Sequence, residues 1–336
     1  MNKMMGDISY SNMRALLKDC LCEVQERAAN SSLPGVSTGF KSIDDLTGGL
    51  ENGKVYVIGG RPCMGKEEFI LSMIIDIVLE SRLPVLMFST NHLKTDYIQR
   101  LLTIHCDIPT THLHQGFLEC HEWERLDKGV ETLIDVPFFI HDSLDLPLNV
   151  LIETARDCIR EREIKVIFID CLQMIEFAKE DNNLSEKIAQ VLFSLKQLAC
   201  LADVPIVVGS MLGRGVEYRE GIDGKKPQLM DLANSSYIEG LADVVMMVHR
   251  PEYYHIYTDD NGRDLHGKME IIINKNALRP LGSTCLEYHH KTGIVNMITN
   301  TRESYSKPVR LKDFESDNKA VKNLIKTFSL EEELPF

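Results

Sequence analysis

The chain has 336 residues, of which 44% are hydrophobic and 26% are charged, and its formal net charge at pH 7 is −13. This length can hold one large α/β domain of about 250–270 residues with short appendages, and the acidic balance argues against broad affinity for DNA or anionic membranes, although a local basic channel could survive. Nine cysteines without framework spacing are typical of reduced thiols, and neither a signal peptide nor a long apolar run is present, so we expect a cytoplasmic protein that does not span a membrane.

Residues 1–34 predict an amphipathic helix followed by a linker. Apolar residues recur there at the helical spacing i, i+3, i+4, i+7, i+8 and i+11, in the set Met13, Leu16, Leu17, Cys20, Leu21 and Val24. The following segment, Asn30–Gly35, is typical of a linker. The apolar stripe needs a groove, which lies either on the helix's own domain or on a neighbouring subunit. We favour the neighbouring subunit and expect self-association into a ring or filament through Met13–Val24.

Strands and helices alternate over residues 35–305, a pattern that predicts a mostly parallel sheet with helices on both faces. The expected strands are Val55–Gly59, Val85–Ser89, Phe138–Ile140, Val166–Asp170, Pro205–Ser210, Val244–Val248, Lys268–Asn274 and Ser283–Tyr288. The expected helices are Glu67–Ser81, Lys94–His105, Asn149–Glu163 and Ser185–Ala202. A C-terminal segment, residues 306–336, is expected to form a helix at Asn318–Phe328 and an acidic tail.

A glycine-punctuated turn between the first strand and its helix has the pattern G-x-x-x-x-G-K. Its residues are Gly60, Arg61, Pro62, Cys63, Met64, Gly65 and Lys66. Glycines let backbone N–H groups converge on one point, the helix N-terminus adds positive dipole, and the lysine reaches the outer phosphates. The pattern therefore predicts a phosphate loop for ATP, and the alternative is a strand–helix turn without a ligand.

Two carboxylates bear on the metal that accompanies such a nucleotide. A working phosphate loop places Ser or Thr after the lysine to hold Mg²⁺, whereas this chain has Glu67. Its charge suits the helix dipole and can pair with Lys66, but it opposes phosphate binding. Asp170 ends an apolar strand and would hold Mg²⁺ through water beside the phosphate loop. Glu67 and Asp170 are thus the candidate metal residues.

Five stretches in this order carry a resemblance to a known family: GVSTGFKSIDDLTGGLENGKVYVIGGRPCMGK, VLMFST, VIFIDCLQMI, SLKQLACLADVPIVVGSMLGR and IEGLADVVMMVHRPEYY. From about Gly35 to Ile298 the chain resembles the RecA-like ATPase domain of bacterial replicative DNA helicases of the DnaB type. The resemblance implies a RecA-like P-loop fold preceded by a linker helix that docks on the next subunit of a ring. Residues 1–34 hold no counterpart of the family's N-terminal collar domain, which puts primase recruitment through a collar in question.

The resemblance assigns nucleotide-binding roles to several residues besides the phosphate loop. It implies that Asp170 holds the metal, that Gln173 follows it in the same motif, and that Arg214 closes the sensor segment. It also implies that Arg250 lies near the nucleotide base and that Lys275 reaches toward a neighbour's nucleotide.

Other family positions carry changed residues, which bear on catalysis. Asn91 stands where the family has its water-activating glutamate, and an amide is a poor proton acceptor. Met211 replaces a polar glutamine that senses the γ-phosphate. Ala277 occupies the position of the arginine finger, a residue that raises the rate of hydrolysis by about 10³–10⁵ where it has been measured. Arg279, two residues further on, could serve as a displaced finger.

The loops that the resemblance implies face DNA carry little positive charge. Lys225, Lys226 and Arg214 provide the local basic clusters, with acidic residues interleaved, and Ala233 replaces an arginine in the DNA-contacting loop. Single-stranded DNA is therefore a possible but weak partner.

Two functions follow. The chain is either an active ATP-dependent DNA helicase that unwinds duplex DNA, or a member of that family with impaired hydrolysis that acts as a ring-forming or regulatory replication protein. The changed residues favour the second, with binding of ATP and Mg²⁺ in question.

The last residues suggest a partner-binding tail. Glu331–Glu333 precede Leu334, Pro335 and Phe336, which resembles the acidic tip of bacterial single-stranded-DNA-binding proteins. A terminal aromatic ring and carboxylate suit an apolar pocket with a basic rim. We expect the tail to bind replication or repair proteins, and the alternative is a solvated acidic end.

Overall fold

The structure, a computed structural model, describes residues 12–29 and 33–298, apart from 144, 177–183 and 233–234. The chain divides into two compact units. One consists of residues 1–32 and 300–336, and the other of Leu33–Thr299. The described part of the first unit is one helix, α1 (Met13–Ala29), as the spacing predicts. Several of its apolar side chains are exposed, among them Met13, Leu16, Leu17 and Val24. The helix expected at Asn318–Phe328, and the residues Leu334, Pro335, Phe336 and Ala233, lie outside the described residues.

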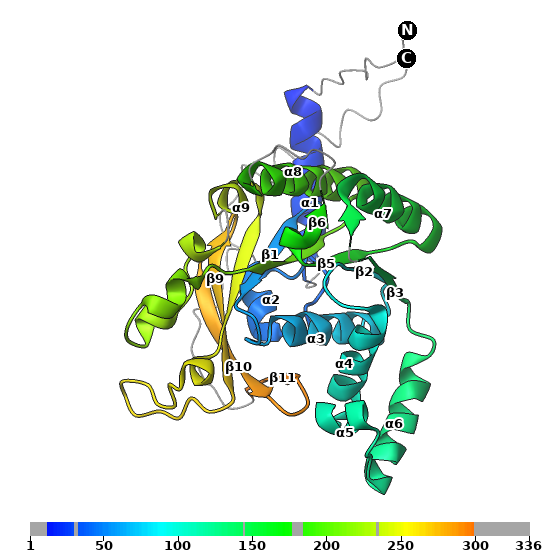
Figure 1. Ribbon diagram of the computed structural model, residues 1–336. Coiled ribbons are helices and arrows are strands. Elements are labelled where there is room, and N and C mark those ends of the chain that lie inside the picture. The colour runs from blue at the N-terminus through cyan, green and yellow to red at the C-terminus, as the bar shows by residue number, and fades with distance from the viewer. Residues whose placement is uncertain (1–11, 30–32, 144, 177–183, 233–234, 299–336) are drawn as a thin grey trace. The chain divides into compact units, whose positions relative to one another are not determined.

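The second unit is built on a nine-stranded sheet in the order β11-β10-β9-β8-β1-β7-β5-β2-β3 (Figure 1). The six strands from β8 to β3 run parallel, while β9, β10 and β11 add antiparallel pairs at one side. Their bounds are β1 Val55–Gly60, β2 Val85–Ser89, β3 Phe138–Asp142, β5 Val166–Asp170, β7 Ile206–Met211, β8 Val244–His249, β9 Lys268–Asn276, β10 Gly282–His289 and β11 Ile294–Met297. A separate pair joins β4 (Leu146–Pro147) to β6 (Ile175–Glu176). The mostly parallel α/β architecture confirms the predicted fold class.

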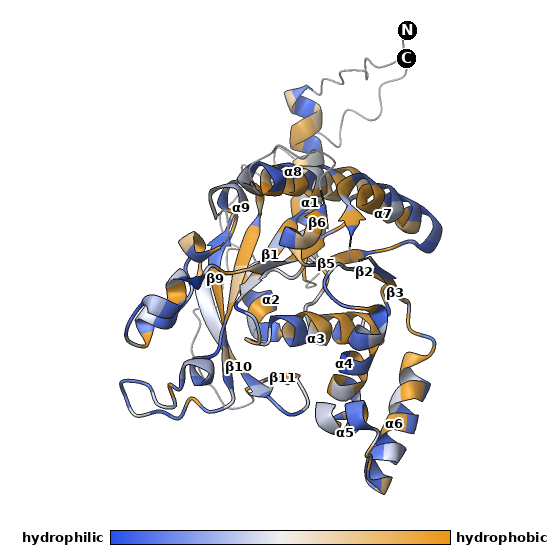
Figure 2. Cartoon of the chain, viewed as in Figure 1, coloured by the Kyte–Doolittle hydropathy of each residue, from blue (hydrophilic) through white to orange (hydrophobic). Residues whose placement is uncertain are grey.

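Helices cover both faces of the sheet and create two apolar cores. The helices are α2 Lys41–Thr47, α3 Lys66–Leu79, α4 Lys94–Cys106, α5 Thr110–Gln115, α6 Cys120–Leu133, α7 Leu148–Arg162, α8 Leu184–Ala202 and α9 Ser235–Leu241. One core packs α2, α3 and α4 against the sheet, and the other packs α7, α8 and α9 against the opposite face. Apolar residues accordingly concentrate in the central strands and in α8, whereas α6 is of mixed character (Figure 2).

Strand register sets the position of the site. Gly60 at the end of β1 pairs with Met211 at the end of β7, and Ser89 at the end of β2 pairs with Asp170 at the end of β5. The carboxyl ends of these parallel strands therefore meet at one edge of the sheet, where ligands of open α/β sheets bind.

Among the helices that the structure describes, none has both the length and the apolar character needed to cross a bilayer.

Candidate nucleotide site

Residues 60–66 leave β1 and turn into the first residue of α3, as the G-x-x-x-x-G-K pattern predicts. Gly65 has φ +93°, and a Cβ there would meet Met269 Cε at 2.4 Å, so only glycine fits. Cys63 also has a positive φ of 61°. Arg61 is held by Glu217, its Nη2 lying 2.6 Å from Oε1, while Pro62 and Cys63 are exposed and Met64 is buried. The turn thus has the shape of a phosphate loop.

Lys66 is engaged by Asp170 rather than free to reach a phosphate. Its Nζ lies 3.0 Å from Asp170 Oδ1, and the two side chains are only 9% and 2% exposed. The hydroxyl of Tyr97, on α4, donates to the other oxygen of Asp170. Burial alone would lower the pKa of Lys66, but Asp170, together with Cys171 and Glu67, outweighs it and the pKa is raised. The ammonium therefore stays charged and is paired with the Asp170 carboxylate.

Glu67 forms its own ion pair on the other side of the loop. Its carboxylate bonds to Arg100 of α4, whose Nη1 also lies 3.7 Å from Glu68 Oε1. His92 Nε2 approaches Glu67 Oε2 at 3.5 Å. Burial would lower the pKa of Arg100, but Glu67 and Glu68 raise it above its ordinary value. The pair that Glu67 could form with Lys66 is not found: Lys66 pairs with Asp170 at the end of β5, and Glu67 pairs with Arg100 of α4.

These contacts do not fit a Mg²⁺ ion shared with a nucleotide. Such an ion needs a hydroxyl ligand, a nearby carboxylate and phosphate oxygens. Here a carboxylate, Glu67, takes the place of the hydroxyl, and both oxygens of Asp170 already have donors in Lys66 and Tyr97.

Asn91 follows β2 beside the end of β5. The buried residue before it, Thr90, joins the two strand ends: its backbone N–H donates to the Asp170 carbonyl at 2.8 Å, and its Oγ1 accepts from Cys171 N at 2.7 Å. Asn91 Nδ2 lies 3.2 Å from His92 Nε2. The structure thus brings Asn91 to the edge that carries Asp170, and this residue offers an amide rather than a carboxylate.

Gln173 and Met211 contact each other across the strand ends. Gln173 lies in a 3₁₀ turn (Leu172–Met174) after β5, and its Nε2 donates to Ser210 Oγ at 2.9 Å. Its Oε1 accepts from the backbone N–H of Met211 at 3.1 Å. The amide therefore links β5 to β7. Arg214 is exposed in the turn that follows β7.

Arg250, the residue after β8, contacts a tyrosine that lies next to the phosphate loop. Its guanidinium carbon sits 4.4 Å from the centre of the Tyr288 ring, a cation–π distance. A Cβ at Gly65 would meet Tyr288 Cε2 at 3.3 Å. Arg250 and Gly65 therefore share Tyr288 as a neighbour.

Lys275, Ala277 and Arg279 lie at the opposite edge of the sheet. Strand β9 runs antiparallel to β8, so Glu270 pairs with His249 at the phosphate-loop edge and Asn276 pairs with Val244 at the other. Lys275 Nζ donates to the Ala242 carbonyl at 2.5 Å and also to that of Glu239. Arg279 Nε lies 3.7 Å from Glu51 Oε1. These residues are remote from their own chain's phosphate loop, and Ala277 is exposed.

The two lysines of the predicted basic cluster differ in their partners: Lys226 pairs with a carboxylate, whereas Lys225 bonds to a backbone carbonyl. Lys225 Nζ donates to the Glu217 carbonyl at 2.6 Å, and its ammonium lies 5.2 Å from the centre of the Tyr254 ring. Lys226 Nζ lies 3.5 Å from Glu270 Oε2. Both lysines therefore have partners within the chain.

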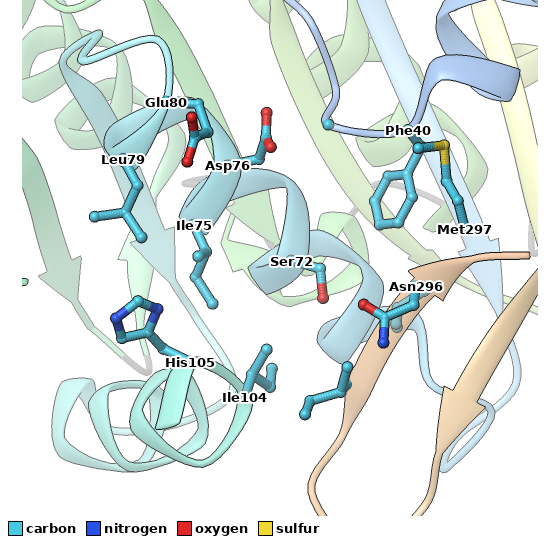
Figure 3. A pocket seen from close by; sticks show the side chains of 13 residues that line it. Phe40, Ser72, Ile75, Asp76, Leu79, Glu80, Ile104, His105, Asn296 and Met297 are labelled. Carbon is cyan, nitrogen blue, oxygen red and sulfur yellow. The ribbon is translucent and has the colours of Figure 1, made fainter. Parts of the chain in front are cut away.

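A cavity of about 340 Å³ lies elsewhere, beside α3, α4 and β11 (Figure 3). Asp76 and Glu80 line it together with apolar residues, among them Ile75 and Ile104. Burial, and then Glu80 and Asp44, raise the pKa of Asp76. A wall with carboxylates does not suit phosphate, so this cavity is not the nucleotide site.

Tyr97, Arg100 and His92 are the site residues that the sequence did not reveal. The spacing i, i+3 places Tyr97 and Arg100 on one face of α4, but nothing in the sequence says which strand end that face meets.

A phosphate loop between a buried parallel strand and its helix, with a carboxylate at a neighbouring strand end, defines the class: a RecA-like P-loop NTPase fold. A family model described as the DnaB-like helicase C-terminal domain matches residues 35–295. The chain belongs to this family.

Individual relatives agree. A probable replicative DNA helicase of Trieres chinensis is 32% identical over 276 residues, which are 81% of this chain and 59% of the relative. The replicative DNA helicase DnaB of Treponema pallidum (strain Nichols) is 31% identical over 281 residues, or 83% of this chain and 60% of the relative. The chain therefore spans about three fifths of the length of these curated relatives.

Solved structures have the same architecture. One that is described as an ATPase domain superposes with a TM-score of 0.77 at 25% identity, covering 86% of this chain and 100% of that one. A DnaB-like replicative helicase, described with its interactions with primase, gives 0.76 at 25% identity, covering 85% of this chain and 68% of that one.

Proposed function

We propose that this chain keeps the ring-forming ATPase fold of DnaB-like helicases, hydrolyses ATP very slowly or not at all, and acts in DNA replication as an assembling or regulatory member of that family. The main observation behind the proposal is the ion pair between Lys66 and Asp170, in which Tyr97 donates to the second carboxylate oxygen. It neutralises the two groups that nucleotide chemistry needs most, the phosphate-binding ammonium and the metal-holding carboxylate. Glu67 and Asn91 add a charge and an amide where hydrolysis needs a hydroxyl and a base.

We expect purified full-length chain to turn over ATP at well below the usual enzyme range of about 1–10³ s⁻¹, with or without single-stranded DNA. The measurement is phosphate release under Mg²⁺, with Lys66→Ala as the matched variant. If the signal comes from this site, it falls in that variant; the proposal expects the same near-zero rate in both.

The competing function is an active helicase, which the preserved turn geometry at Gly65 favours. Turnover within the usual range, stimulated by single-stranded DNA and lost in Lys66→Ala, would establish that function and overturn ours.

Self-association is the second part of the proposal. Helix α1 exposes an apolar set, and α8 and α9 line a mostly apolar groove of about 680 Å³. Phe193 and Tyr237 in that groove are 53% and 40% exposed. Exposed apolar surface of this size on a single chain indicates an interaction surface for a partner. In this family the linker helix docks on the next subunit, so we propose that the α1 helix of a second copy occupies this groove.

Charged residues in the α1 stripe are expected to dissociate the assembly. Burying one Leu is worth about 1.5–3 kcal/mol, so Leu17→Glu with Leu21→Glu should weaken association by roughly a hundredfold or more. Native mass spectrometry measures this, and Phe193→Glu should act in the same direction.

The matched control is Leu201→Glu, because Leu201 is 78% exposed on the same α8 helix yet outside the groove lining. An unmodified chain that is monomeric throughout, or an assembly that Leu201→Glu disrupts equally, would contradict docking of α1 in this groove.

A further inference from the structure

The cavity of about 340 Å³ beside α3 is a groove along a partly exposed face of that helix, and we call it the α3 groove (Figure 3). Its floor is formed by residues of α3 at the spacing i, i+3, i+4 and i+7, which are Ser72, Ile75, Asp76 and Leu79. Ile104 and His105 of α4 line one side, and Ile294–Met297, the whole of β11, line the other. The floor thus has the periodicity of about two helical turns.

The α3 groove combines apolar walls with carboxylates that have no cation beside them. Asp76 and Glu80 line it, and neither side chain has a hydrogen-bond or ion-pair partner among the residues that the structure describes. Burial, and then the charges of Glu80 and Asp44, raise the pKa of Asp76. Burial lowers the pKa of His105, so this imidazole is neutral near pH 7 and supplies no counter-charge. The groove therefore suits apolar side chains with positive charges next to them.

Residues 318–328, NKAVKNLIKTF, have the complementary pattern. Their apolar residues recur at the same spacing i, i+3, i+4 and i+7, in the set Val321, Leu324, Ile325 and Phe328. Three lysines repeat on the flank of this stripe, Lys319, Lys322 and Lys326, and the segment contains no acidic residue. The sequence predicts a helix for this segment, which lies outside the described residues.

We propose that residues 318–328 of this protein bind in the α3 groove as a helix, with the apolar stripe on Ile75 and Leu79 and the lysines beside Asp76 and Glu80. An amphipathic helix that lays its apolar face into a groove is a recurring mode of peptide recognition, with anchors at i, i+3, i+4 and i+7. Both partners show this spacing, and their charges are opposite.

The lengths of the two partners also agree. At 1.5 Å per residue, the stripe from Val321 to Phe328 spans about 10.5 Å, the same as the floor from Ser72 to Leu79. The chain between β11 and the segment, residues 298–317, can extend to roughly 65 Å, so its length permits docking. Met297, on the β11 side, is 42% exposed and offers further apolar surface to the helix.

The test is amide hydrogen exchange of the full-length chain followed by mass spectrometry, with the exchange rate of residues 318–328 as the readout. A docked helix exchanges slowly, because its amides open only when the segment leaves the groove. Leu324→Glu places a charge in the apolar stripe and should speed exchange by at least about tenfold, given what burying one Leu contributes. Asn323→Glu is the matched control: it adds the same charge on the opposite side of the helix and should change the rate by no more than about twofold.

A charge exchange between the partners identifies the groove. Asp76→Asn with Glu80→Lys removes both carboxylates and should speed exchange of the segment by about three- to tenfold, the effect of a few exposed ion pairs. Lys322→Glu with Lys326→Glu should act in the same direction. Combining the four substitutions should recover most of the protection, because the reversed charges attract again. Glu153→Lys, at an exposed position of α7 on the opposite face of the sheet, should have no effect.

Two results overturn the proposal. One is exchange of the segment at the unprotected rate in the unmodified chain. The other is protection that the Asp76 and Glu80 substitutions leave unchanged, because the segment then binds a different surface. The measurement involves neither nucleotide nor turnover, so its outcome is independent of the proposed function.

Discussion

Restoring two family residues, Glu67→Thr and Asn91→Glu, is expected to bring back nucleotide binding before it brings back hydrolysis. The threonine removes the carboxylate from the phosphate pocket, supplies the hydroxyl that Mg²⁺ needs, and releases Arg100. The glutamate supplies a proton acceptor beside Asp170. Ala277 is unchanged, however, and an absent arginine finger costs about 10³–10⁵ in rate. Binding should therefore recover by at least about tenfold while turnover stays slow.

The binding of a fluorescent ATP analogue in the presence of Mg²⁺ measures nucleotide affinity. Phosphate release measures the rate of hydrolysis. Glu68→Thr is the matched control, because it removes the neighbouring carboxylate and leaves Glu67 in place. Equal recovery of binding in Glu68→Thr would show that general charge, rather than the metal position, limits affinity. Hydrolysis at a normal rate in the double variant would show that Arg279 or another group supplies the finger.

The ion pair between Lys66 and Asp170 is expected to be a stability element rather than a catalytic one. Removing one partner of a buried pair leaves an uncompensated charge and costs about 3–5 kcal/mol. Lys66→Met and Asp170→Asn should each lower the free energy of unfolding by about this amount. The double variant should cost much less than their sum, because no buried charge remains unpaired.

Urea unfolding followed by circular dichroism measures these free energies. Lys41→Met is the control: Lys41 pairs with Asp45 at 3.2 Å, but the two side chains are 77% and 63% exposed, so its cost should be within about 1 kcal/mol. Strictly additive costs for Lys66 and Asp170 would contradict the assignment.

The pH dependence of this pair has a definite sign. The folded-state pKa of Lys66 is raised above its ordinary value of 10.5, so the contribution is fully present below pH 10.5 and is lost as the pH rises through the raised pKa.

The strands were predictable because each is a run of apolar residues bounded by turns. The bounds of β2 and β5 match the expected ones, and those of β1 differ by one residue. Helix α6 was missed although its sequence, CHEWERLDKGVETL, is amphipathic, and even in the fold its Trp123 and Val130 are 50% and 43% exposed. Short elements such as β11 depend on the neighbouring strand for their hydrogen bonds, which local sequence does not encode.

Only those features of the candidate site that are local in sequence were predictable. The glycine spacing and the strand ending in Asp170 located the phosphate loop and its carboxylate. The partner of Glu67 and the second donor to Asp170 could not be predicted, because Arg100 and Tyr97 come from a helix whose packing depends on the whole core. The change from a Lys66–Glu67 pair to two separate pairs is a tertiary effect.

The antiparallel course of β9 places two segments at opposite ends of the strands. The phosphate loop faces one direction, and the segment Lys275–Arg279 faces the other. In a head-to-tail assembly, one copy would therefore take part in two junctions, offering a self-neutralised pocket to one neighbour and Ala277 to the other. A single copy inserted among hydrolysing relatives would silence both junctions that it touches, so its influence on such an assembly would exceed its share of the subunits.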